Sequence, residues 1–130
     1  LHLDNPRIIF TGYVDDSDLN VIYSEAIALC YVSVYEGFGL PPLEAMSCRT
    51  PVIYGDNSSL REVIGDNGLP ADAHDINSIK AQIEKLFFDK DFRDKLAIRA
   101  HHKSFEFSSR KAIFETLKVY EKVIKNQALS

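Results

Sequence analysis

The segment Glu36-Gly-Phe-Gly-Leu-Pro-Pro-Leu-Glu44 constrains the fold of this chain more than any other stretch. The apolar run that precedes it, residues 26–34, is typical of a strand buried on both faces. The proline pair after the two glycines can open a helix, so we expect the order strand, glycine loop, helix. This order places backbone N–H groups and a positive helix end at the carboxyl end of a strand, where open α/β sheets bind ligands.

The two glutamates of this segment are suited to binding hydroxyl groups, because an ionised carboxylate only accepts hydrogen bonds. Glu36 is expected at the end of the strand. Glu44 is expected about one turn inside the helix, where its side chain leans back toward the loop. Gly37 and Gly39 let the backbone approach a ligand closely. Anion-binding amides between two such carboxylates predict a ligand that carries phosphates and sugars.

Strands that alternate with helices predict an α/β fold with a parallel, Rossmann-like sheet flanked by helices. Short strands are expected at 7–10, 26–34, 51–54 and 69–70. Helices are expected after the acidic start at 15–18, over 41–48, over 59–64 with a capping box at Ser59 and Glu62, and in three stretches after a cap at Asp75.

The last of these helices aligns four apolar side chains at helical spacing, namely Ile113, Leu117, Tyr120 and Ile124. We expect this stripe to be an internal packing face. A contact with another domain or with a second copy of the chain is the alternative.

Composition narrows the class of protein. The 130 residues suffice for one domain, and a net charge of −4 argues against a nucleic-acid partner bound through a broad basic surface. No apolar run reaches the roughly 18 residues of a membrane-spanning helix. Cys30 lies in the apolar run and is expected as a small buried core residue. The two cysteines do not form a CxxC pair, and a reduced, cytoplasmic compartment fits their use.

With these motifs in place, the chain resembles the retaining, nucleotide-sugar-dependent glycosyltransferases of the GT-B fold, the group 1, family 4-like enzymes. Glu36 to Met46 resembles their signature, and the flanking similarity covers nearly the whole chain. It runs through Phe10-Thr-Gly-Tyr-Val14, Thr50-Pro-Val-Ile53, residues 60–64 with Arg61 where the family often has proline, Gly68-Leu69, Phe107-Ser108 and Tyr120-Glu121.

The resemblance implies that residues 1–130 are a truncated C-terminal, donor-binding domain, an incomplete half of the GT-B fold. The start of this domain and the acceptor-binding N-terminal domain are expected to be absent, so the fragment alone is expected to be inactive. The implied reaction transfers a hexosyl group, mannosyl or glucosyl, from a nucleotide diphosphate sugar to a carbohydrate or lipid-linked acceptor with retention of configuration. Such an enzyme would serve polysaccharide biosynthesis, and its full-length form could associate peripherally with a membrane.

The resemblance also assigns roles to individual residues. Glu36 would contact the transferred sugar near the reacting centre, and Glu44 would hold the ribose hydroxyls of the nucleotide. The loop would bind the rest of the donor through Gly37 and the N–H groups of Phe38, Gly39 and Leu40. Tyr13 and Val14 would touch the base.

Asp16-Ser17-Asp18 matches the Asp-x-Asp pattern that holds a metal in a different glycosyltransferase fold. Its place at a helix start is explained by capping. The family that the chain resembles needs no such metal, so the resemblance implies neither a metal nor another cofactor. Other functions on the same fold stay open, namely a nucleotide-sugar epimerase, a phosphorylase, or a non-catalytic module that binds nucleotide sugars.

Overall fold

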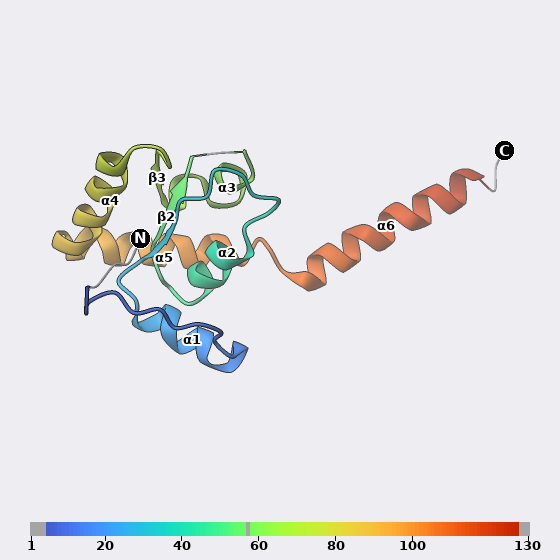
Figure 1. Ribbon diagram of the computed structural model, residues 1–130. Coiled ribbons are helices and arrows are strands. Elements are labelled where there is room, and N and C mark those ends of the chain that lie inside the picture. The colour runs from blue at the N-terminus through green and yellow to red at the C-terminus, as the bar shows by residue number, and fades with distance from the viewer. Residues whose placement is uncertain (1–4, 57, 128–130) are drawn as a thin grey trace.

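The computed structural model describes residues 5–56 and 58–127, and its centre is a three-stranded parallel sheet with helices on both faces (Figure 1). The strands β1 (Leu29–Tyr31), β2 (Val52–Gly55) and β3 (Leu69–Ala71) lie in the order β1-β2-β3. In the register, Leu29 lies opposite Val52, and Ile53 lies opposite Leu69. Helices connect successive strands, as parallel pairing requires. The predicted α/β sheet is confirmed.

The helices agree closely with the sequence pattern. In chain order they are α1 (Asp16–Glu25), α2 (Leu40–Ser47), α3 (Ser58–Ile64) with the 3-10 turn η1 (Gly65–Asn67), α4 (Ile76–Phe88), α5 (Lys90–Ser104) and α6 (Ser109–Gln127). The expected caps are present, because the Asp15 and Asp75 side chains accept hydrogen bonds from the first-turn N–H groups of α1 and α4.

Two hydrophobic clusters lie on opposite faces of β2. Val52 and Tyr54 pack with α2 and α3 on one face, and Ile53 packs with α4 and α5 on the other. This alternation follows from the two-residue period of a strand. All of β2 is buried, and the side chain of Met46 from α2 is fully buried against it. The fixed position of α2 over β2 sets where the signature helix begins.

The strand within residues 26–34 is shorter and less buried than predicted. Only Leu29–Tyr31 form β1, which lies at the edge of the described sheet. Leu29 and Tyr31 pack toward the cluster of α2 and α3, so Cys30 points to the other face. On that face, the main contacts of α4 with the sheet are with β2 and β3 and not with β1. Cys30 is therefore exposed, and its prediction as a buried core residue is wrong.

Two further local predictions are wrong. Residues 7–10 do not form a strand, and Ile9 and Phe10 are each 81% exposed, because the segment pairs with no described strand. Ser59 is not the N-cap of α3, because the helix begins one residue earlier at Ser58; its hydroxyl donates to the backbone oxygen of Glu36 at 2.7 Å. The end of α3 at Ile64 is as predicted.

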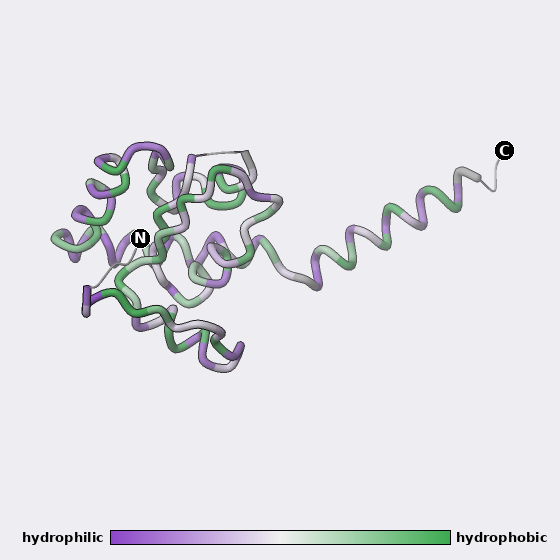
Figure 2. The backbone as a smooth tube through the Cα atoms, viewed as in Figure 1, coloured by the Kyte–Doolittle hydropathy of each residue, from purple (hydrophilic) through white to green (hydrophobic). Residues whose placement is uncertain are grey.

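Helix α6 projects away from the rest of the described chain (Figure 1). Hydrophobic and hydrophilic residues alternate along it (Figure 2). Its stripe of Ile113, Leu117, Tyr120 and Ile124 is between 52% and 66% exposed, so the internal packing predicted for this face is wrong. The alternative, a contact with another domain or copy, stays a prediction. Within residues 5–56 and 58–127, no helix combines the length and apolar character needed to cross a membrane.

Candidate functional site

Glu36 lies five residues after the end of β1 and is held at two points. Its carboxylate oxygen Oε1 accepts a hydrogen bond of 2.7 Å from the hydroxyl of Tyr31, the last residue of β1. Its backbone oxygen accepts the bond from Ser59 of α3. The bond to Glu36 is the main reason that the pKa of Tyr31 is raised above its ordinary value. The glutamate therefore lies in the loop beyond the carboxyl end of β1 and not, as was predicted, at the end of the strand itself, because β1 stops at Tyr31.

Glu44 lies in the second turn of α2 and is exposed. Its Oε2 atom accepts a hydrogen bond of 3.3 Å from the hydroxyl of Tyr23 on α1. Burial raises the pKa of Tyr23 above its ordinary value, and the charge of Glu44 raises it further. Tyr23 in turn contributes to the raised pKa of Tyr31. The rings of Tyr23 and Tyr31 both pack against the cluster of α2 and α3, so the two glutamate–tyrosine pairs lie on the same face of the sheet.

The two glycines of the loop differ in their surroundings. Gly39 is the N-cap of α2 and adopts a left-handed conformation with φ 91°. A Cβ atom there would lie 2.5 Å from Cδ2 of Leu60 on α3. Gly37 has open space where a Cβ would be. Gly39 is thus required for the tight approach of loop and α3, while the role of Gly37 toward a ligand stays a prediction.

The loop amides lie at the positive end of α2. Leu40 is the first residue of this helix, and Phe38 and Gly39 come directly before it. A helix N-terminus of this kind favours phosphate oxygens, although the two prolines that follow cannot donate. Phe38 and Leu40 line a hollow of about 420 Å³ together with Leu43, residues 106–108, Lys111, Ala112 and Glu115. The Phe38 and Phe107 rings pack edge to face, with their centroids 5.9 Å apart.

Tyr13 and Val14 lie in the irregular segment before α1, where Tyr13 is 90% exposed and Val14 is half-buried. Their predicted contact with a base remains a prediction. Asp15 accepts hydrogen bonds from Ser17, which agrees with capping as the reason for the acidic start of α1. Among the residues that the structure describes, no three His, Cys, Asp or Glu side chains gather in a way that could hold a metal ion.

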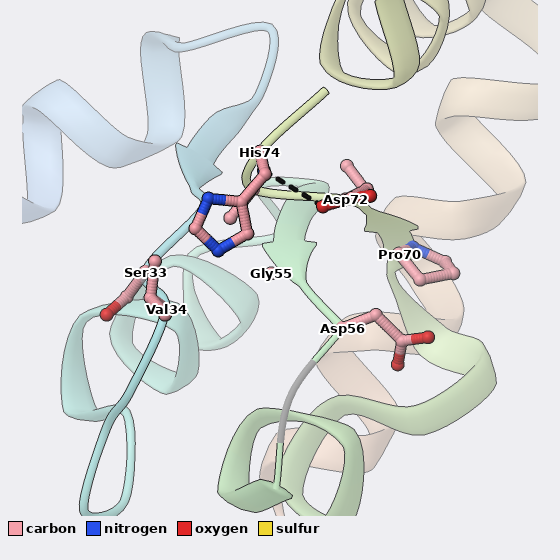
Figure 3. Close-up of a pocket in the computed structure, with 9 residues that line it drawn as sticks. Ser33, Val34, Gly55, Asp56, Pro70, Asp72 and His74 are labelled. Carbon is pink, nitrogen blue, oxygen red and sulfur yellow. Dashed lines mark hydrogen bonds between the residues drawn. The ribbon is translucent and has the colours of Figure 1, made fainter. Parts of the chain in front are cut away.

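A separate hollow of about 550 Å³ opens where the three strands end (Figure 3). It is lined by Ser33 and Val34 in the loop after β1, by Gly55 at the end of β2 and the following Asp56, and by residues 70–74, which include the end of β3 and the loop after it. The side chain of Asp72 accepts a hydrogen bond from the N–H of His74, and Asp56 pairs with Arg61 at 2.9 Å. The residues that line it include neither Glu36 nor Glu44, so the two signature glutamates do not form the wall of this hollow.

Sequence reasoning missed the residues that hold the two glutamates. Tyr31 carries a recognisable signal, because it ends the apolar strand only five residues before Glu36. Tyr23 and Ser59 carry none, since their contacts with Glu44 and Glu36 span 21 and 23 residues. Such contacts depend on the packing of α1 and α3 around the loop.

The fold is a Rossmann-like α/β domain, with two carboxylates and a helix N-terminus beyond the carboxyl edge of a parallel sheet. The profile of the family described as glycosyl transferases group 1 matches residues 2–103. The chain belongs to this family, and it corresponds to a C-terminal domain of the GT-B fold.

Individual relatives agree with the family. The chain is 41% identical over 114 residues to O-antigen chain mannosyltransferase B of Escherichia coli, covering 88% of this chain and 30% of the relative. It is 38% identical over 106 residues to the serotype-specific mannosyltransferase WbdA of Escherichia coli, covering 82% of this chain and 13% of the relative. A solved sucrose-phosphate synthase from Thermosynechococcus elongatus matches with a TM-score of 0.84 at 28% identity, over 92% of this chain and 31% of that one.

Proposed function

We propose that this chain is the donor-binding domain of a retaining hexosyltransferase. The enzyme transfers a hexosyl group from a nucleotide diphosphate sugar to a carbohydrate or lipid-linked acceptor, which binds through a further domain. Mannose is the favoured hexose, because several relatives are named mannosyltransferases. The observation that carries the proposal is the pair of signature glutamates, each held by a tyrosine beside the N-terminus of α2.

The chemistry of the pair fits the two parts of such a donor. Glu36 contacts the transferred hexose, where a fixed negative charge stabilises the oxocarbenium-like character that develops as the diphosphate leaves. Glu44 accepts hydrogen bonds from the ribose hydroxyls. Between them, the amides of Phe38, Gly39 and Leu40 bind the diphosphate oxygens near the positive end of α2. No metal or other cofactor takes part in this proposal.

Product analysis with the intact protein tests the reaction. Nucleotide diphosphate sugars that differ in base and hexose are incubated with carbohydrate and lipid-linked acceptors, and the products are examined by mass spectrometry and NMR. We expect a glycosidic product with the anomeric configuration of the donor. An epimerised nucleotide sugar, a sugar phosphate formed with inorganic phosphate, or binding of nucleotide sugar without turnover would instead support the other functions on this fold.

The assigned role of Glu36 is tested with Glu36→Gln, which keeps the shape of the side chain and removes its charge. We expect kcat to fall by about 100-fold or more, the scale seen when one electrostatic stabiliser is removed from an active site. Glu62→Gln is the matched control, because Glu62 is an exposed glutamate of α3. Retained activity in Glu36→Gln at an unchanged melting temperature would contradict the assignment.

A further inference from the structure

Each signature glutamate accepts a hydrogen bond from a tyrosine that belongs to a different element of the fold. The Tyr31 hydroxyl at the end of β1 donates to Glu36, and the Tyr23 hydroxyl on α1 donates to Glu44. A carboxylate has two oxygens with about four acceptor positions, so one phenol leaves capacity for the hydroxyl groups of a sugar. The tyrosines can therefore hold the carboxylates while a ligand is bound.

Tyr31 is itself fixed by the sheet. It pairs with Tyr54 of β2 in the parallel register, and its ring packs against the cluster formed by α2 and α3. The hydroxyl reaches past this cluster to the carboxylate, while Ser59 holds the Glu36 backbone from α3. The distance between the Tyr31 hydroxyl oxygen and Oε1 of Glu36 is 2.7 Å, and a hydrogen bond of this length to a carboxylate belongs to the stronger class. The direction of the Glu36 side chain is thus determined by a rigid strand rather than by its own loop.

Tyr23 is fixed from another direction. Its ring packs against the same cluster, and its backbone oxygen accepts a hydrogen bond from the buried hydroxyl of Thr50, two residues before β2. This contact ties the end of α1 to the sheet. The bond from Tyr23 to Glu44 is longer, at 3.3 Å, and Glu44 is exposed. The Tyr23 contact is therefore the weaker of the two.

We propose that Tyr31 and Tyr23 are positioning residues, which orient Glu36 toward the transferred hexose and Glu44 toward the ribose respectively. This inference rests on the proposed function of the two glutamates. Because each tyrosine acts through a different glutamate, the two have separable effects. Loss of the Tyr31 hydroxyl mainly lowers kcat, and loss of the Tyr23 hydroxyl mainly raises KM for the nucleotide sugar.

The test uses Tyr31→Phe and Tyr23→Phe in the full-length enzyme, since phenylalanine keeps the packed ring and removes the donor. We expect a 10- to 100-fold fall in kcat for Tyr31→Phe with a change in KM below threefold, on the scale that small misplacements of a reacting group cause. For Tyr23→Phe we expect KM to rise by about three- to tenfold with a change in kcat below threefold.

Tyr54→Phe is the matched control, because its ring is buried in the same cluster and its hydroxyl donates to the backbone oxygen of Gly65 at 3.2 Å. This variant loses a tyrosine hydrogen bond that involves neither signature glutamate. We expect a lower melting temperature with kcat and KM close to wild type. The inference is overturned if all three tyrosine variants change kcat and KM alike, or if neither Tyr31→Phe nor Tyr23→Phe changes them.

A double-mutant cycle separates positioning from general loss of structure. If Tyr31 acts through Glu36, adding Tyr31→Phe to Glu36→Gln should lower kcat by less than threefold beyond the single Glu36→Gln variant. A full additional 10- to 100-fold loss would overturn the role. Wild-type kcat in Glu36→Gln would refute the proposed function and this inference together. Wild-type kcat in Tyr31→Phe beside an inactive Glu36→Gln would refute this inference alone.

Discussion

Replacing Gly39 with alanine is expected to destabilise the chain by about 2–5 kcal/mol, although the change adds only one methyl group. Two costs contribute. A residue with a Cβ in the left-handed conformation of Gly39 loses about 1–2 kcal/mol. The new Cβ would also lie 2.5 Å from Cδ2 of Leu60, where carbon atoms normally approach to about 3.5–4.0 Å.

Leu60 has little room to give way, because its side chain is fully buried between α3 and the sheet. Its methyl group would have to move by about 1 Å, and overpacking of this kind costs about 1–3 kcal/mol. Gly37→Ala is the matched control in the same loop. Nothing lies within 4 Å of its Cβ position. There we expect no loss, or a gain of about 0.4–1 kcal/mol from the stiffer unfolded chain.

Urea unfolding followed by circular dichroism measures both variants against wild type. Gly39→Ala should lower the midpoint without changing the slope, while Gly37→Ala should leave the midpoint unchanged or raise it. Leu60→Val removes the methyl group that clashes with the new Cβ in Gly39→Ala. The double variant should therefore lose about 1–3 kcal/mol less free energy of unfolding than the two single variants lose in sum. Equal midpoints for the two glycine variants, or full additivity with Leu60→Val, would refute this reasoning.

Four further outcomes are expected. Met46→Ala should cost about 2–5 kcal/mol in urea unfolding, because its fully buried side chain leaves a cavity. Asp75→Ala should cost about 1 kcal/mol in the same assay through loss of the α4 cap. Ser59→Ala should speed hydrogen exchange of the Glu36 loop amides, because a bond worth about 0.5–1.5 kcal/mol is lost. The raised pKa of Tyr31 implies a contribution to stability that is complete below pH about 10 and is lost as the pH rises further. Between neutral and alkaline pH, the free energy of unfolding should therefore fall less for Tyr31→Phe than for the wild-type chain.

The parts of the fold that follow from local chemistry could be predicted from the sequence. Proline in the first turn gave the start of α2 to within one residue, and aspartate caps marked α1 and α4. These signals depend on neighbours in the chain, which the sequence contains. The four-residue strand β2 also follows from its apolar run, because helices on both faces bury it.

Burial of the other strands depends on what lies next to them in space. The run 26–34 is as apolar as a central strand, yet only three of its residues pair and Cys30 is exposed at the sheet edge. Residues 7–10 have strand-forming composition and no described strand to pair with. The amphipathic pattern of α6 likewise indicates an apolar face without indicating what covers it. A periodic pattern predicts an element and its faces, and the partner of each face is a separate question.

The candidate site shows the same division between local and distant contacts, and it explains the spacing of the two glutamates. Glu36 must follow β1 closely enough for Tyr31 to reach it, and Glu44 must lie on the face of α2 that meets Tyr23. One residue more or fewer between Leu40 and Glu44 would rotate the carboxylate by about 100° around the helix axis and away from Tyr23. The left-handed turn at Gly39 allows the chain to enter α2 directly after the loop. The eight-residue separation is therefore fixed by a strand end, one glycine turn and one helical turn, each with its own physical requirement.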